Sequence, residues 1–539
     1  MRPPQSQRIH HRILLPAICL LTLLIYGRAY DAGFVTDFTG LYAKMQGKGL
    51  ADALQSFGFP SLMPLLNVVY WLLYKLCGLK ALGWFLCAVV YSTITLVTFY
   101  KMVSLLAEDF GARRKATRIA LLASALVLCS PYQVEAMIWK VGLGHLMSVL
   151  FFMLALYQLL LYLRAETTKH LIGTLTLLML SLFCFEWGLV FPAMAAVLLI
   201  GYLRLGRLTI TKAASTFVST LIPVVIYFIL TKLVLGSWLG HYDMDTEMRL
   251  DVGTMASTIL KYFIKSLGLV HFYPNDLKQS IYMLADKSWV VVVIMTALVA
   301  MIISGYWRGS RGQLLAAMGL SCALLGLVLV SGLYFHSLLL SENDRYGSLF
   351  IYFLALVVTL GLMALPRWLG YGLFLVLLGT QIFFQQKMVS QWSRSQDQVE
   401  KITDSFQRLA IRQEDKVLML NLPENLCGTF MFRDFSGQNP LLDHLNMYGI
   451  PSPPMDLVAQ YNVPYGGQAF TGSWVAKGKI RLVAREWGSW WWKKGLGVGK
   501  YETEAYLFEP RSKAMELQLK EGHTYTKIIY FDGESWQAL

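Results

Sequence analysis

The chain has 539 residues, of which 56% are apolar and only 15% are charged. An average soluble protein is roughly 45–50% apolar and about 25% charged, so this composition excludes a fully soluble protein. The net charge is +14, and nearly all of the basic surplus falls within residues 1–386, where the apolar runs also lie. Because a nucleic-acid footprint needs basic residues on an exposed soluble face, this surplus instead favours basic loops on the inner side of a membrane.

Eleven apolar runs are long enough to cross about 30 Å of hydrocarbon. They centre on residues 13–28, 82–106, 117–131, 146–163, 169–185, 188–203, 214–235, 288–306, 314–337, 346–364 and 368–385. The first run follows a basic stretch, as in a signal peptide, but the many later runs favour an uncleaved first span.

A twelfth apolar run, residues 62–79, is expected to lie in the membrane interface rather than to cross. If it crossed, the basic cluster at 113–118 and every later basic loop would face outside. If it does not cross, the basic loops fall on the inner side with the N-terminus, as the positive-inside rule requires. The segments that then lie outside are residues 29–81, 236–287 and 387–539.

The last outer segment, residues 387–539, has a different composition from the rest. Residues 389–411 repeat apolar side chains at three-to-four spacing, which predicts an amphipathic helix leading out of the membrane. Short alternating runs separated by Gly and Pro follow, which is typical of a small α/β domain. We therefore expect a polytopic α-helical membrane domain, residues 1–386, and a soluble extracytoplasmic α/β domain, residues 387–539.

Acidic residues of the membrane domain gather mainly on the expected outer side, where a carboxylate beside hydrocarbon is costly and usually has a task. Asp37 follows the first span, although it could instead cap a helix that starts near Thr39. Glu135 lies just outside the third span, followed by Trp139 and Lys140; the alternative is an interfacial aromatic residue with its salt-bridge partner. Because the span centres are almost free of charge, the sequence favours a one-sided site over a transport path.

Two further charged residues stand at the outer ends of spans. Glu186 ends the fifth span between aromatic residues, where a desolvated carboxylate needs a partner or a raised pKa. Arg345 stands at the outer mouth of the tenth span, and its planar guanidinium suits a phosphate, with an ordinary flanking charge as the alternative.

Four segments, in this order, resemble hallmarks of GT-C class membrane glycosyltransferases that use polyprenyl-phosphate-linked sugars. They are GFVTD (33–37), the interfacial segment and second span (59–100), SPYQVEAMIWKVGLGHLMSVLFFMLALYQ (130–158) and NDRYGSLFIYF (343–353). The chain is similar to bacterial relatives of the membrane part of the tetratricopeptide-repeat O-mannosyltransferases.

The resemblance implies transfer of a sugar from a polyprenyl-phosphate donor to a cell-envelope glycan, lipid or protein acceptor. It further implies an inverting hexosyl- or pentosyltransferase that works on the outer face of a bacterial inner membrane. Asp37 matches the family's catalytic residue, as base or acceptor-orienting group. The expected contacts of the donor phosphate are Arg345, Lys265 and His271. The expected substrate pocket contains Glu135, Lys140, His145, Glu186 and Tyr346.

The chain departs from the family pattern at several positions. Phe38 replaces the second Asp of the first motif, Leu143 replaces an expected Arg, and Phe185 replaces the usual Lys. Since tetratricopeptide repeats are also missing, the sugar and the acceptor do not carry over. The alternatives are a flippase or transporter of a lipid-linked glycan, which needs no base, and a membrane sensor with an outer glycan-binding domain.

Metal dependence is open, because some members of the class use a divalent cation. Four carboxylates at positions 243, 245, 247 and 251 could hold a hard cation, but a solvated loop face is the favoured interpretation. The seven cysteines form no close pair with metal-ligand spacing. We therefore assign no metal site and leave a divalent cation as an optional cofactor.

Overall fold

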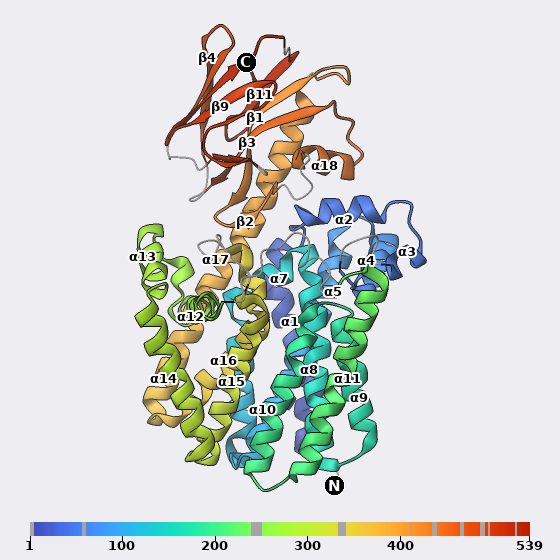
Figure 1. The fold of residues 1–539 in the computed structure, drawn as a ribbon, viewed down its shortest axis with the longest axis vertical. Helices are drawn as coiled ribbons and strands as arrows, with labels where there is room; N and C mark the ends of the chain where they lie inside the picture. The colour runs from blue at the N-terminus through green and yellow to red at the C-terminus, as the bar shows by residue number, and fades with distance from the viewer. Residues whose placement is uncertain are drawn as a thin grey trace. The chain divides into compact units, whose positions relative to one another are not determined.

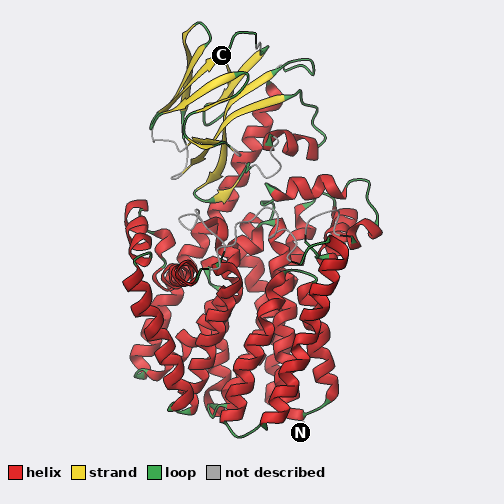
Figure 2. Ribbon diagram, in the orientation of Figure 1, coloured by secondary structure: helices red, strands yellow, loops and turns green. Residues whose placement is uncertain are grey.

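The computed structural model divides the chain into two compact units. One, the helical unit, comprises Met1–Tyr30, Gly47–Leu339 and Asn343–Met388, and the other, the second unit, comprises Asp31–Gln46, Leu340–Glu342 and Val389–Leu539. The residues that the structure describes are 5–55, 61–238, 251–332, 341–409, 411–433, 439–463, 468–485, 491–493, 496–522 and 525–539. Within them the helical unit contains helices without strands, and the strands belong to the second unit (Figure 2).

Most helices of the helical unit coincide with the predicted apolar runs, while α3, α12 and α13 lie in the segments expected outside the membrane (Figure 1). They are α1 (Gln5–Tyr26), α3 (Leu50–Leu54), α4 (Pro64–Cys77), α5 (Ala81–Asp109), α6 (Ala116–Leu128), α7 (Val134–Ile138), α8 (Leu143–Ala165), α9 (Thr168–Leu182), α10 (Phe191–Arg204), α11 (Ile210–Leu235), α12 (Val252–Gly268), α13 (Asn275–Ala285), α14 (Ser288–Trp307), α15 (Arg311–Ser331), α16 (Ser348–Ala364) and the first part of α17 (Arg367–Arg408). Short 3-10 turns join several of them, including η3 (Arg113–Lys115), η5 (Lys140–Gly142), η6 (Glu186–Val190), η8 (Val270–Phe272) and η9 (Ser341–Gly347).

Eight helices among the described residues are long and apolar enough to cross a membrane. The count is nine if the bent pair of helices Arg113–Leu128 and Pro131–Ile138 forms one span. Two more of the expected spans correspond to shorter apolar helices, Leu14–Ala29 and Thr168–Leu182. The run that we expect in the interface is α4, a 14-residue helix that ends at Gly78, whose φ of 54° favours glycine. Helices of this number, length and apolar character are typical of a membrane protein, while the exact number of spans stays a prediction.

Helix α15 packs against α10, α14 and α16, and glycines allow close approach at these contacts. A Cβ added at Gly305 of α14 would lie 2.6 Å from Ala317, and one added at Gly326 of α15 would lie 3.1 Å from the backbone nitrogen of Phe350. The first distance is shorter than real Cβ contacts and the second is unusually tight, so glycine at these positions lets the helices approach closely.

Several basic turns meet at one end of the helical unit. Asp109, the last residue of α5, accepts from Arg164 Nε at 2.8 Å and from Arg207 at 2.6 Å. Arg204 donates to the carbonyl of Trp307 at 2.6 Å, which joins the turn after α10 to the end of α14. Because α8 runs from Leu143 near Glu135 to the turn holding Arg164, the two ends of the unit are about 34 Å apart, at ~1.5 Å per residue.

The second unit holds two sheets. The strands are β1 (Val417–Leu426), β2 (Thr429–Phe430), β3 (Met455–Val463), β4 (Phe470–Ala476), β5 (Lys479–Ala484), β6 (Trp491–Lys493), β7 (Gly497–Val498), β8 (Tyr501–Glu502), β9 (Tyr506–Pro510), β10 (Ala514–Leu519), β11 (Lys527–Phe531) and β12 (Trp536–Ala538). One sheet has the order β12-β11-β1-β3-β6-β7, with β1 parallel to both neighbours and β2 paired to β1. The other is the antiparallel sheet β4-β5-β10-β9-β8.

The apolar stripe predicted in residues 389–411 lies on the second part of α17. Trp392 packs edge-on against Phe430, with ring centroids 6.4 Å apart, and Ile402 accepts a hydrogen bond from the indole of Trp536 at 3.0 Å. Trp392, Val399, Ile402 and Phe406 are buried and Leu409 is half-buried, which explains the three-to-four spacing in the sequence. Residues 31–46 also belong to this unit, since α2 (Asp37–Met45) packs against α18 (Pro440–Met447).

Candidate active site

Two expected site residues, Glu135 and Arg345, meet although 210 positions separate them. Glu135 lies on the short helix α7 and is buried, and η9 carries Arg345 beside it. The backbone nitrogen of Arg345 donates to Glu135 Oε2 at 2.8 Å, and its guanidinium forms an ion pair with Oε1. Both the main chain and the side chain of Arg345 are thus fixed on one carboxylate.

Aromatic rings surround this ion pair. The guanidinium of Arg345 lies 4.7 Å from the ring centre of Trp139 and 4.5 Å from that of Tyr346, distances typical of cation–π contacts. The ring of His145 stands edge-on to Tyr346 at 5.5 Å, and its Nδ1 accepts from the indole of Trp187 at 3.2 Å. Glu135, Arg345, Tyr346 and His145 therefore form one cluster, as their joint prediction requires.

A second buried ion pair lies next to this cluster. Lys265 of α12 pairs with Asp344, the residue directly before Arg345, and the two side chains are 1% and 0% exposed. The hydroxyl of Tyr132 donates to the carbonyl of Lys265, and the ammonium lies 5.7 Å from the ring centre of Tyr262. The sequence does not single out Asp344, because nothing in its spacing connects it to Lys265.

Lys278 of α13 also faces this region, which the sequence does not indicate. The side chain is buried. The pKa of Lys278 is lowered to about 8, mainly because burial disfavours the charged form; the nearby ammonium of Lys265 also lowers it, while Asp344 acts in the opposite direction. The sequence predicts that a lysine in the polar segment 236–287 is exposed to solvent. Its burial is seen only in the packing of α13.

Glu186, the first residue of η6, is buried next to the cluster. Its neighbour Phe185 contacts the ring of His145, with ring centres 4.2 Å apart. Glu186 Oε2 has no hydrogen-bond partner among the described residues. Lys140 is buried too, and its ammonium donates to the carbonyl of Tyr30 at 2.9 Å, which ties η5 to the end of the first helical segment.

Two predicted residues stand apart from this description. His271 lies in η8, but its side chain is outside the described residues. Asp37 belongs to the second unit, where it is the first residue of α2 and half-buried. The residues around it, including Phe34 and Phe38, are buried with their rings 4.7 Å apart.

The capping alternative for Asp37 differs from the observed helix start. Helix α2 begins at Asp37 itself, two residues before the expected Thr39, so Thr36 occupies the capping position. Thr36 has a φ of 58°, which is unfavourable for a β-branched residue and costs about 1–3 kcal/mol. The sequence gives no signal for this strained residue immediately before Asp37.

The described residues do not offer a built metal site. In the described part of the chain, no three or more His, Cys, Asp or Glu side chains are grouped so that they could hold a metal ion. Asp243, Asp245 and Glu247 of the acidic patch lie outside the described residues, and Asp251 accepts from Thr254 N at 2.7 Å as the cap of α12.

The cavity beside Trp139 and Lys140 has a volume of about 10 Å³, lined also by Trp84 and Met137. Such a volume is close to the minimum that holds one water, so a sugar would need side chains to move.

No protein-family model matches the chain. A search of curated proteins finds no match either.

Proposed function

We propose that the chain is a membrane glycosyltransferase that transfers a sugar from a polyprenyl-phosphate donor to an acceptor in the cell envelope. The carrying observation is the pairing of Glu135 with Arg345. These residues come from two segments, 130–158 and 343–353, that each resemble the GT-C class separately. Their meeting, together with Trp139 and Tyr346, supports one site built from both.

In this reaction the protein has to position the two substrates, remove one proton and stabilise the charge on the leaving phosphate. A polyprenyl-phosphate sugar carries an activated anomeric carbon and a phosphate leaving group, so one base suffices to take the acceptor's proton. We assign this role to Asp37 on its resemblance to the family motif. Arg345 and Lys265 would stabilise the charge that develops on the departing phosphate. Because both cations pair with carboxylates, the donor phosphate would compete with Glu135 and Asp344 for them.

The proposed setting is the outer face of a bacterial inner membrane, with eleven spans and the N-terminus inside. The gathering of basic turns at the Asp109 end supports this orientation, because basic turns favour the inner side. The Glu135 end would then face outward.

The test uses purified full-length protein with a radiolabelled polyprenyl-phosphate sugar, and it measures both released polyprenyl phosphate and label in the acceptor fraction. Asp37→Asn should lower release by at least about 100-fold, because a general base contributes on that order. Asp31→Asn, in the same loop, is the matched control and should keep activity. Full activity of Asp37→Asn, with unchanged folding, would contradict the assignment and favour the flippase alternative.

A second candidate, a sensor with a glycan-binding domain, has one supporting observation. The second unit has a cavity of about 480 Å³ whose lining includes Lys416, Asp456, Lys493, Tyr506 and Tyr525. This volume lies in the range of small-molecule sites, and tyrosines stack well on sugar rings. Binding of envelope glycans by a protein inactive in the transfer assay would favour this candidate.

A further inference from the structure

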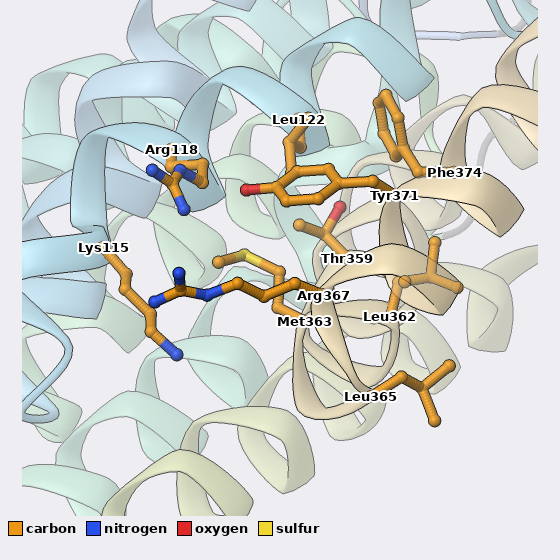
Figure 3. A pocket seen from close by; sticks show the side chains of 11 residues that line it. Lys115, Arg118, Leu122, Thr359, Leu362, Met363, Leu365, Arg367, Tyr371 and Phe374 are labelled. Carbon is orange, nitrogen blue, oxygen red and sulfur yellow. The ribbon is translucent and has the colours of Figure 1, made fainter.

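A separate cavity lies at the basic end of the helical unit, between α6, α16 and the first part of α17 (Figure 3). Its volume is about 40 Å³, and its lining includes Lys115, Arg118, Thr359, Met363 and Arg367. The cavity follows η3, the turn after the Asp109 end of α5, so it lies at the other end of the unit from the Glu135 cluster.

The lining is strongly cationic on one side. Figure 3 shows the charged ends of Lys115, Arg118 and Arg367 gathered on one side of the cavity, with apolar side chains on the other. The lining contains no carboxylate. Within the described part of the chain, these three cations form no ion pair with an acidic residue, unlike Arg164 and Arg207 close by. Three cations held near one another without an anion favour an anionic ligand.

A buried hydroxyl group adds an independent observation. Thr359 of α16 is 0% exposed, and its Oγ1 has no hydrogen-bond partner among the described residues. A helical threonine can donate its hydroxyl to the carbonyl one turn earlier, and a buried hydroxyl without a partner is unfavourable. Figure 3 shows the Thr359 oxygen on the side of the cavity that faces Tyr371. A ligand oxygen in the cavity would supply the missing acceptor.

We propose that this cavity binds the phosphodiester headgroup of an anionic membrane lipid. A volume of 40 Å³ corresponds to about three water-sized positions, so the cavity can admit the oxygens of a headgroup whose remainder lies outside it. The ring of Tyr371 lies 5.9 Å from the Arg118 guanidinium, and Trp368 beside it is 78% exposed. Exposed aromatic residues at a helix end mark the level of lipid headgroups, and basic pockets between membrane helices at this level bind such headgroups.

Lipid is the favoured source of the phosphate because apolar surface adjoins the cavity. Leu375 and Val376 of α17 are 66% and 67% exposed, so acyl chains attached to a bound headgroup have an apolar surface to lie on. Free phosphate would use the cations alone. The site is distinct from the Glu135 cluster and does not depend on the proposed transfer reaction.

The test measures binding of a fluorescent phosphatidylglycerol to purified full-length protein in phosphatidylcholine nanodiscs. Arg118→Gln and Arg367→Gln should each weaken binding about fivefold, since one basic residue near a lipid surface contributes ~1 kcal/mol. Arg114→Gln is the matched control, because Arg114 is exposed, as Lys115, Arg118 and Arg367 are, but does not line the cavity. It should change binding less than twofold.

A further variant tests the Thr359 hydroxyl, and competition with inorganic phosphate tests whether the ligand is a lipid. Thr359→Val keeps all charges and nearly the same volume, and should weaken binding two- to fivefold, on the order of one lost hydrogen bond. Equal losses in Arg114→Gln and Arg118→Gln would overturn the proposal, because a general surface charge would then explain binding. Displacement of the lipid by equimolar inorganic phosphate would also overturn it, in favour of a free-phosphate site. Thermal unfolding of each variant checks that the fold is retained.

Discussion

The two ends of the helical unit both bury carboxylates against arginines, yet they satisfy them differently. At one end, Asp109 accepts from Arg164 and Arg207 and also from the hydroxyl of Tyr202. One carboxylate thus joins three cationic or donor groups from separate elements. At the other end, Glu135 and Asp344 each pair with one cation, Arg345 and Lys265 respectively.

The difference indicates different tasks. The Asp109 carboxylate accepts from three donors on separate elements and so holds these turns together. The Glu135 end instead has Glu186 Oε2 without a hydrogen-bond partner in the described structure and has paired cations whose partners a phosphate could replace. Buried charges that are not fully satisfied are costly, so we interpret the Asp109 end as structural and the Glu135 end as functional.

The largest expected change in the free energy of unfolding follows from breaking the Lys265–Asp344 ion pair. Lys265→Met should lower the free energy of unfolding by about 3–5 kcal/mol, because it leaves a fully buried carboxylate without its cation. The double variant Lys265→Met with Asp344→Leu should recover most of that loss, since no buried charge remains. Thermal or denaturant unfolding in detergent measures both. A stable double variant without transferase activity would support a functional role for the pair.

The Asp109 end should respond in stability alone. Asp109→Asn is expected to cost about 2–3 kcal/mol, less than a fully buried pair, because the side chain of Arg207 is 48% exposed and can reach water. Activity per folded molecule should stay unchanged. Glu108→Gln is the matched control, since Glu108 is 30% exposed and its 3.3 Å contact with Arg164 should contribute less than about 1 kcal/mol. A loss of activity in folded Asp109→Asn would contradict the comparison.

The smallest stability effect is expected at Glu186. Glu186→Gln should change the free energy of unfolding by less than about 1 kcal/mol, because one carboxylate oxygen makes no hydrogen bond that the amide would break. The same substitution should lower transfer activity about tenfold or more if the carboxylate polarises a substrate. Unfolding and transfer are measured on the same Glu186→Gln variant. If Glu186 had a structural role, the variant would lose stability and keep transfer activity.

The sequence predicts the helices well because their cause is local. Each apolar run folds into a helix, and the stripe of residues 389–411 lies buried as its spacing indicates. The length of a helix is less predictable. Helix α9 has only 15 residues, because it ends at Leu182, before the turn that leads to Glu186. Grouping of residues 31–46 with the second unit depends on the packing of α2 against α18, which no local pattern encodes.

Residues of the candidate site can be predicted from the sequence only where their segment resembles a known family. Glu135 and Arg345 stand in segments that resemble a family, and the structure brings them together. Asp344 and Lys278 have no such signal, because their importance comes from burial beside Lys265, and burial of a polar residue on an outer segment is a tertiary property.

The glycine contacts of α15 also limit how the helical unit can move. Shear between two helices requires side chains that interdigitate and can shift from one groove to the next. Where Gly326 meets the backbone of Phe350, a displacement of α15 along α16 would bring a bulkier neighbouring residue against that backbone. Helices α15 and α16 should therefore move as one body, so any rearrangement within the helical unit is expected at contacts between other helices.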